Sequence, residues 1–326
     1  MRMPISITRR HLLGIFASTA TLPVGAIAQS TRTVRLIVNT SAGSGLDTTA
    51  RAIQSALGQA LGAAIVIDNQ AGASGLIGLQ ALARASADGG TLGLSTTNLA
   101  IFPSILKTVP FNVTTDFTPI AIIGEVPLVM IANPAKVRAT NAKEFVTVLK
   151  SNPSAFNYAS SGSGTILHLA SELLLEEIGV KIKHIPYKGA TPMLMDTISG
   201  QVDFAAAALP AALPYIKSGA LRAIGLCAAQ RVPLAPEIPT FAEQGIPNVV
   251  VRSWASVLGP KGMEPATVKK YHEAIVTVLK DAAVRDALGK QAMVIGLQTP
   301  EEAQVTIRGD VEKYAKLAKK IGLETQ

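Results

Sequence analysis

The sequence predicts an α/β fold of two domains, with two parallel-rich sheets flanked by helices. Short runs rich in Val and Ile alternate with longer amphipathic segments along most of the 326-residue chain. Nearly continuous apolar strands are typical of parallel sheets that are buried on both faces. The chain is also long enough for two domains of ordinary size. These observations together favour a two-domain α/β protein.

The expected strands are short apolar runs, and the expected helices are the segments with helical periodicity between them. The strands are expected at 34–38, 64–67, 91–94, 120–123, 128–132, 156–159, 181–185, 202–206, 221–226 and 253–258. The helices are expected at 46–61, 76–85, 142–150, 166–178, 192–198, 265–280, 282–290 and 300–320.

Two passages, 124–127 and 252–258, look like crossings between the domains. We therefore expect residues 29–126 together with 254–326 to form lobe 1, and the inserted residues 127–253 to form lobe 2. A cleft between two α/β domains is a common place for a small ligand to bind.

The first 28 residues have the three parts of a secretory signal peptide. Arg2, Arg9 and Arg10 form a basic start, an apolar run follows, and the small residues Ala26 and Ala28 mark a cleavage site. The arginine pair also fits the twin-arginine export route, so the route stays open. A membrane anchor is the alternative, but the run is short for a span of about 20 residues. We expect an exported, periplasmic protein.

Composition argues against several classes of function. The formal net charge is +8, but no basic stripe with interleaved aromatic residues indicates nucleic-acid binding. Cys227 is the single cysteine, so no disulfide is expected within the chain. His168, His184 and His272 lack the spacing of metal ligands. We expect neither a metal site nor a cofactor.

Three loops of small, hydroxyl-bearing residues stand between an expected strand and the segment after it. They are 39–47 (NTSAGSGLD), 95–98 (STTN) and 160–165 (SSGSGT). Small residues let a ligand approach the backbone, and helix N-termini present free N–H groups. Hydroxyl groups add donors without adding charge. Ordinary capped turns are the alternative for any one loop, but three such loops favour a site for a carboxylate.

A dinucleotide site is one competing interpretation of the first loop. Gly43 and Gly45 begin a pattern close to G-x-G-x-x-G after a strand, and Asp68 ends the next strand. However, Thr48 stands where the third glycine or an alanine belongs, and an exported protein does not meet the cytoplasmic NAD pool.

An exported hydrolase is the second competing interpretation. Ser163 lies between two glycines and His168 follows in the next expected helix. The G-x-S-x-G pattern is absent, and no third acid that would orient the histidine is identifiable. We therefore expect His168 to cap or pack, and we expect no enzyme activity.

Many stretches in order carry a resemblance to one family. They are 34–51 (VRLIVNTSAGSGLDTTAR), 67–78, 88–94, 116–120, 127–133, 156–168 (FNYASSGSGTILH), 184–189, 200–203, 209–214, 219–223 and 236–240. The chain resembles the solute-binding receptors of tripartite tricarboxylate transporters, also known as Bug-type receptors. The resemblance implies a periplasmic receptor of the two-lobed binding-protein class, whose lobes close on one ligand like a flytrap.

The resemblance also implies the binding residues, a ligand class and partners. In the family a ligand carboxylate is held by the first loop and by the serine-rich loop of the second lobe. By position, the implied ligand-binding residues are Ala42, Gly43, Ser44, Asp47, Thr96, Asn98, Ser160, Ser161, Ser163, Thr165 and Ala207. Whether Asp47 contacts the ligand or caps its helix stays open. The implied partner is a membrane permease with a large and a small subunit, served by a monomeric receptor.

Two departures from the family pattern affect specificity. Leu46 replaces a hydroxyl-bearing residue in the first loop, and Ala207 with Ala208 replaces Asp-Ser before a Leu-Pro pair. The loss of that acid favours a carboxylate with an apolar or uncharged far end over an acidic amino acid. A receptor that presents its ligand to a membrane sensor is an alternative to transport.

Overall fold

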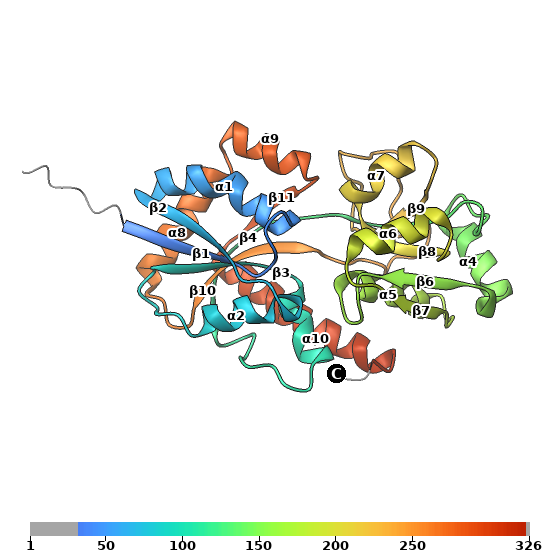
Figure 1. Ribbon diagram of the computed structural model, residues 1–326, viewed down its shortest axis with the longest axis horizontal. Coiled ribbons are helices and arrows are strands. Elements are labelled where there is room, and N and C mark those ends of the chain that lie inside the picture. Colours follow the sequence, from blue (N-terminus) through green and yellow to red (C-terminus); the bar gives the residue numbers. More distant parts are fainter. Residues whose placement is uncertain (1–31, 324–326) are drawn as a thin grey trace, which may run out of the picture. The chain divides into compact units, whose positions relative to one another are not determined.

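The computed structural model describes residues 32–323 (Figure 1). The expected signal peptide, 1–28, lies outside the described residues. The strands are β1 (Arg32–Val38), β2 (Ala63–Asn69), β3 (Thr91–Thr96), β4 (Phe117–Glu125), β5 (Leu128–Ala132), β6 (Asn157–Ser160), β7 (Lys183–Pro186), β8 (Phe204–Ala208), β9 (Arg222–Leu226), β10 (Trp254–Pro260) and β11 (Val294–Gln298). The helices are α1 (Gly45–Leu61), α2 (Leu76–Ala83), α3 (Asn98–Ile105), α4 (Ala142–Ser151), α5 (Ile166–Glu177), α6 (Ala190–Ser199), α7 (Leu209–Lys217), α8 (Pro265–Val278), α9 (Ala282–Lys290) and α10 (Pro300–Lys320).

The strands form two sheets. The first has the order β11-β4-β10-β3-β1-β2 and the second the order β7-β6-β8-β5-β9. Both sheets are mixed: β1 is parallel to β2 and β3, and β6 is parallel to β7 and β8. Strands β10 and β5 pair antiparallel with their neighbours. The expected parallel pairing therefore holds for only part of each sheet.

The first sheet carries helices on both faces (Figure 1). Side chains alternate along a strand, and in β1 Leu36 and Val38 pack with α1, α8 and α9, whereas Ile37 packs with α2, α3 and α10. All three side chains are at most 1 % exposed. This two-sided burial explains the nearly continuous apolar run in the sequence.

Helix α7 was not among the expected helices, because its sequence contains two prolines. Pro210 stands in the first turn, where the missing N–H costs nothing, and Pro214 lies further inside. Helix α3 was missed for the same reason, because it contains Pro103. Strand β11 was missed as well; its side chains are only partly buried.

The chain passes between the two sheets after Glu125 and again before Trp254. A backbone hydrogen bond from the Val126 N–H to the Ser253 carbonyl, 2.9 Å, joins the two passes. The lobe limits of 29–126 with 254–326, and of 127–253, stay predictions. Within residues 32–323, none of the helices combines the length and apolar character needed to cross a bilayer.

Candidate functional site

The three hydroxyl-rich loops each follow a strand and lead into a helix. They connect β1 to α1, β3 to α3, and β6 to α5. The first two loops lie side by side, because β1 and β3 are neighbours and the Asn39 amide contacts the Ser95 hydroxyl at 3.4 Å. In α/β sheets the carboxyl ends of parallel strands are where ligands bind.

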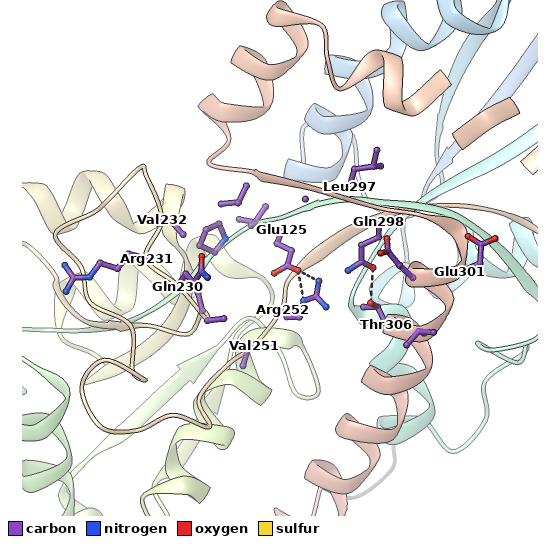
Figure 2. Close-up of a pocket in the computed structure, with 18 residues that line it drawn as sticks. Glu125, Gln230, Arg231, Val232, Val251, Arg252, Leu297, Gln298, Glu301 and Thr306 are labelled. Atoms are coloured by element: carbon purple, nitrogen blue, oxygen red, sulfur yellow. Dashed lines mark hydrogen bonds and ion pairs between the residues drawn. The ribbon is translucent and has the colours of Figure 1, made fainter. Parts of the chain in front are cut away.

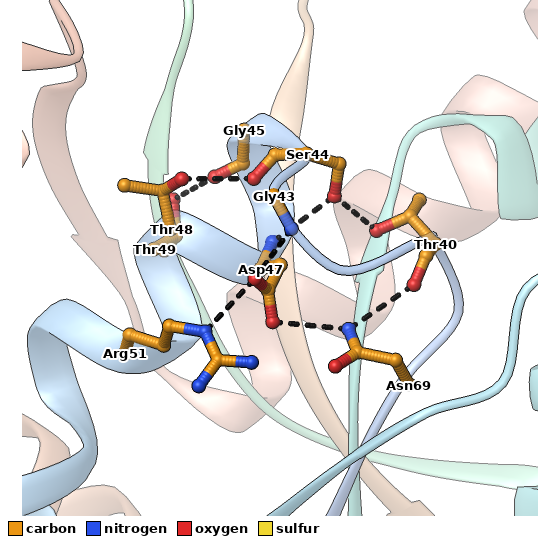
Figure 3. A network of polar contacts seen from close by, with 9 residues as sticks. All are labelled: Thr40, Gly43, Ser44, Gly45, Asp47, Thr48, Thr49, Arg51 and Asn69. Carbon is orange, nitrogen blue, oxygen red and sulfur yellow. Dashed lines mark hydrogen bonds and ion pairs between the residues drawn. The ribbon is translucent and has the colours of Figure 1, made fainter.

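Asp47 organises the first loop (Figure 3). Its carboxylate accepts hydrogen bonds from the Gly43 N–H at 2.8 Å, the Arg51 Nε at 2.9 Å and the Asn69 amide at 3.0 Å. The Asp47 N–H donates to the Ser44 hydroxyl at 3.2 Å, so that Ser44 caps α1. The Asp47 residue is 1 % exposed. Its carboxylate is thus occupied by the protein itself.

The charge of Asp47 follows from these contacts. The hydrogen bond from Arg51 and then that from the Gly43 N–H lower the pKa of Asp47 to about 2, whereas burial raises it. The carboxylate therefore stays ionised at neutral pH. Ala42 and Gly43 lie exposed at the tip of the loop, but the Gly43 N–H already donates to Asp47. The N–H groups of Gly45 and Leu46, in the first turn of α1, have no partner among residues 32–323.

The second loop is short and mostly buried. Thr96 ends β3 and Asn98 begins α3. The Asn98 Oδ1 is buried and has no hydrogen-bond partner in the part of the chain that the structure describes. Between them, Thr97 is 1 % exposed, and its hydroxyl bonds to the backbone of Arg252 and Trp254.

The third loop is held by its own hydroxyl groups. The Ser160 Oγ lies 2.6 Å from the His184 Nε2 and accepts a hydrogen bond from the Gly162 N–H at 3.1 Å. The Ser161 hydroxyl donates to the Thr165 Oγ1 at 3.1 Å, and Thr165 caps α5. Ser163 differs from these residues. It is exposed, and its hydroxyl has no partner among the described residues.

A stack of aromatic rings supports this loop, and no pattern in the sequence predicted it. The His168 and His184 rings lie 4.0 Å apart between centroids at 12°, and Tyr158 stacks against both. The Tyr158 hydroxyl donates to Glu172. Burial lowers the pKa of His168 to about 3 and of His184 to about 4, and burial raises the pKa of Glu172. Both histidines are neutral at neutral pH.

The geometry offers no serine nucleophile. The His168 Nδ1 accepts a hydrogen bond from the Gly164 N–H at 3.0 Å, so this histidine packs and caps as expected instead of activating Ser163. Ser160 contacts His184, but Ser160 is 0 % exposed and therefore is not presented to solvent as a nucleophile would be.

Asn98 and part of the third loop meet at one small cavity. Its lining includes Asn98, Ile105, Ser163, Gly164 and Thr165, and its volume is about 10 Å³, room for about one water molecule. Ala42, Gly43, Ser44 and Asp47 do not line it. Ala207 lies in β8 opposite Val129 and is 2 % exposed.

A larger pocket lies beside the two chain passes (Figure 2). Its volume is about 830 Å³, and its lining includes the ion pair of Glu125 and Arg252, with Gln298 and Thr306 from β11 and α10. None of the predicted binding residues lines this pocket. The hydroxyl-rich loops stay the candidate site, because they lead into the N-termini of α1, α3 and α5 and carry the free hydroxyl of Ser163.

Comparison with known proteins then identifies the family. Residues 49–323 match the tripartite tricarboxylate transporter family receptor. The chain belongs to this family. The receptor is 33% identical over 315 residues to the protein BugT of Bordetella pertussis, with 95% of this chain and 96% of that protein covered.

Solved structures agree with this assignment. The periplasmic binding protein BugD is 30% identical with a TM-score of 0.77, covering 90% of this chain and 99% of that one. A Rhodopseudomonas palustris protein solved with adipate is 29% identical with a TM-score of 0.80, covering 91% and 100%. MatC from the same organism, with bound malate, is 26% identical with a TM-score of 0.74, covering 89% and 99%.

The comparisons confirm the predicted family and the α/β class with two helix-flanked sheets. They support a solute-binding role, because this family and the similar structures are receptors and periplasmic binding proteins, not enzymes. The hydrolase and dinucleotide alternatives therefore find no support.

Proposed function

We propose that this receptor captures a small organic carboxylate in the periplasm and delivers it to a tripartite membrane transporter. The implied permease has a large and a small subunit, and the receptor acts as a monomer without a cofactor. Two similar proteins were solved with adipate and with malate, which are both dicarboxylates. An export signal at residues 1–28, read by either route, would bring the chain to its ligand.

The observation that carries the proposal is the convergence of loops and helix N-termini. Helices α1 and α3 begin within the first two loops and α5 begins directly after the third, and a helix N-terminus attracts an anion through its free N–H groups and its dipole. At one cavity Ser163 adds a free hydroxyl, and Asn98 adds a side-chain amide whose NH2 group can donate. Neutral donors of this kind bind a carboxylate by charge-assisted hydrogen bonds.

We propose that the ligand carries no ammonium group. Asp47 is the only acid in the three loops, and Gly43, Arg51 and Asn69 already occupy its oxygens. Ala207 supplies no charge where the family pattern often has an acid. A ligand ammonium would therefore lose its water without gaining a partner, which costs free energy. Adipate or malate fits this site better than aspartate.

A binding screen tests this proposal. The mature chain from Gln29 is unfolded and refolded to remove bound ligand, then mixed with adipate, malate, citrate, benzoate, aspartate and glutamate. A ligand that binds only the folded state stabilises it by about 2.7 kcal/mol at a hundredfold excess over Kd. We expect dicarboxylates to raise the melting temperature and the two amino acids not to. Tight calorimetric binding of aspartate would contradict the proposed ligand class.

Two matched variants place the ligand. Ser163→Ala and Asn98→Ala should abolish most of the shift, whereas Ser154→Ala, an exposed serine outside the three loops, should keep it. Equal shifts in all three variants would mean that the ligand binds elsewhere.

Delivery to a transporter needs a separate measurement. Deletion of the receptor should stop uptake of the identified carboxylate, and the full-length chain should restore it. Unchanged uptake with a lost transcriptional response would favour the alternative, a receptor that presents its ligand to a membrane sensor.

A further inference from the structure

The second pass of the chain between the sheets is anchored at every residue. This crossing segment, 250–254, leads into β10 and contains Trp254, the only tryptophan of the chain. Two backbone hydrogen bonds hold it: the Val251 N–H donates to the Cys227 carbonyl at 2.9 Å, and the Ser253 carbonyl accepts from the Val126 N–H at 2.9 Å. Two side-chain hydrogen bonds add to these: the Lys313 Nζ donates to the Val250 carbonyl at 2.7 Å, and the Trp254 Nε1 donates to the Asp310 Oδ2 at 2.7 Å. Both the backbone and a side chain of this segment are therefore held by hydrogen bonds.

Thr97 connects the candidate site to this segment. Its hydroxyl donates to the Arg252 carbonyl at 2.9 Å and accepts from the Trp254 N–H at 2.9 Å. The two bonds lie on either side of Ser253. A hydroxyl has one proton to donate, so the Thr97 hydroxyl uses it on the Arg252 carbonyl. Thr97 is 1 % exposed and stands between Thr96 and Asn98 in the chain. It does not line the small cavity that Asn98 shares with the third loop.

The geometry points to Thr97 as a positioning residue that couples ligand binding at Thr96 and Asn98 to the crossing segment 250–254. This inference rests on the proposed function. A ligand that holds the second loop also fixes Thr97, and Thr97 then fixes the backbone on both sides of Ser253. Because coupling between sites is reciprocal, an anchor of the segment far from the loop changes ligand affinity as well.

Thr97→Val tests the hydroxyl with little change in side-chain volume. It leaves the Arg252 carbonyl and the Trp254 N–H without a partner, and we expect roughly five- to tenfold weaker binding of adipate or malate by calorimetry. Thr97→Ser keeps the hydroxyl and should restore affinity. Thr118→Val is the matched control, because the Thr118 hydroxyl donates to the Pro260 carbonyl at 2.8 Å at the far end of β10. It should bind like the wild type.

Two further readouts separate coupling from a general loss of stability. Ligand should change the fluorescence of Trp254 in the wild type and in Thr97→Ser, and should change it much less in Thr97→Val at saturation. Lys313→Met removes the anchor at Val250. Lys313→Met should weaken ligand binding in the wild-type background. In the Thr97→Val background it should have little further effect on affinity, so that the two changes are not additive.

The outcomes distinguish the two proposals. If the wild type binds no carboxylate, the proposed function fails, and this inference fails with it. If the wild type binds and Thr97→Val binds equally well, or if Thr97→Val and Lys313→Met are additive, the inference alone is overturned.

Discussion

The carboxylate of Asp47 accepts the N–H of Gly43 at 2.8 Å, so the acid in the first turn of α1 also closes the loop before that helix (Figure 3). The same carboxylate is bound by Arg51 and Asn69. This arrangement bears on the question that the sequence left open. Asp47 shapes the first loop from inside, and the exposed backbone of Ala42 and Gly45 is what the loop presents outward.

Asp47→Asn should destabilise the protein by about 2 kcal/mol. Hydrogen bonds to a charged group are stronger than neutral ones, and the NH2 group of the new asparagine would face one of the donors that now bind the carboxylate. Urea unfolding measures this loss. Asp68→Asn is the control: Asp68 pairs with Arg35 in a contact where both side chains are at least a third exposed, and it should cost less than about 1 kcal/mol. Equal losses in the two variants would contradict the role assigned to Asp47.

Acid should destabilise the protein in two steps. The pKa values of His168 and His184 lie at about 3 and about 4 in the folded protein, below 6.5 in the unfolded chain. The unfolded chain thus takes up protons first, so this stability is complete above pH 6.5 and is lost as pH falls toward about 3. Asp47, with a pKa of about 2 against 3.8, adds a loss below about pH 4.

Urea unfolding at several pH values checks the first step. His184→Gln keeps a polar partner for Ser160 and should flatten the dependence of unfolding free energy on pH between 6.5 and 4. An unchanged slope in that variant would mean that His184 does not titrate as described.

Local patterns predicted much of this fold. The helix expected at 142–150 is α4, with Asn141 as its cap, and the strand expected at 128–132 is β5. Such elements are visible in the sequence because periodicity and caps act over a few neighbouring residues. The three loops were found for the same reason, since small and hydroxyl-bearing residues follow an apolar run.

Contacts between distant residues were not predictable in this way. His184 meets Ser160 from 24 residues away, and Thr97 meets Arg252 from 155 residues away. No spacing rule relates residues that only the sheet topology brings together. The two missed helices have a local cause, because each contains a proline. Pro103 lies inside α3, whereas Pro210 lies in the first turn of α7, where a proline is compatible with a helix.

Ser161 and Ser163 should respond differently to removal of the hydroxyl. The Ser161 hydroxyl donates to Thr165, so Ser161→Ala should cost about 1 kcal/mol of unfolding free energy. The Ser163 hydroxyl has no partner among the described residues, so Ser163→Ala should leave stability unchanged and weaken carboxylate binding. Denaturant unfolding and calorimetry on both variants check this pair. A loss of stability in Ser163→Ala would contradict the free hydroxyl.

Gly164 joins the third loop to α3, and alanine should not replace it. Its φ of 74° already disfavours a side chain, and an added Cβ would lie 2.6 Å from Ile105 Cδ1 and 3.1 Å from Ile105 Cβ. Rotation of Ile105 cannot relieve the contact with its own Cβ. Gly164→Ala should therefore cost about 1–3 kcal/mol more than Gly179→Ala, where φ is 71° and nothing lies within 4 Å.

An Ile105→Ala background tests whether close packing against Ile105 causes this difference in stability between Gly164→Ala and Gly179→Ala. In an Ile105→Ala background, the extra cost of Gly164→Ala over Gly179→Ala should shrink in urea unfolding, because the Ile105 atoms at 2.6 and 3.0 Å are removed while the contact with Cβ at 3.1 Å and the backbone strain stay. Carboxylate affinity should fall in Gly164→Ala and recover in part in the double variant, since Gly164 and Asn98 line the same cavity. If the cost of Gly164→Ala is the same in both backgrounds, the third loop does not depend on its contact with α3, and the site must be built by the loops separately.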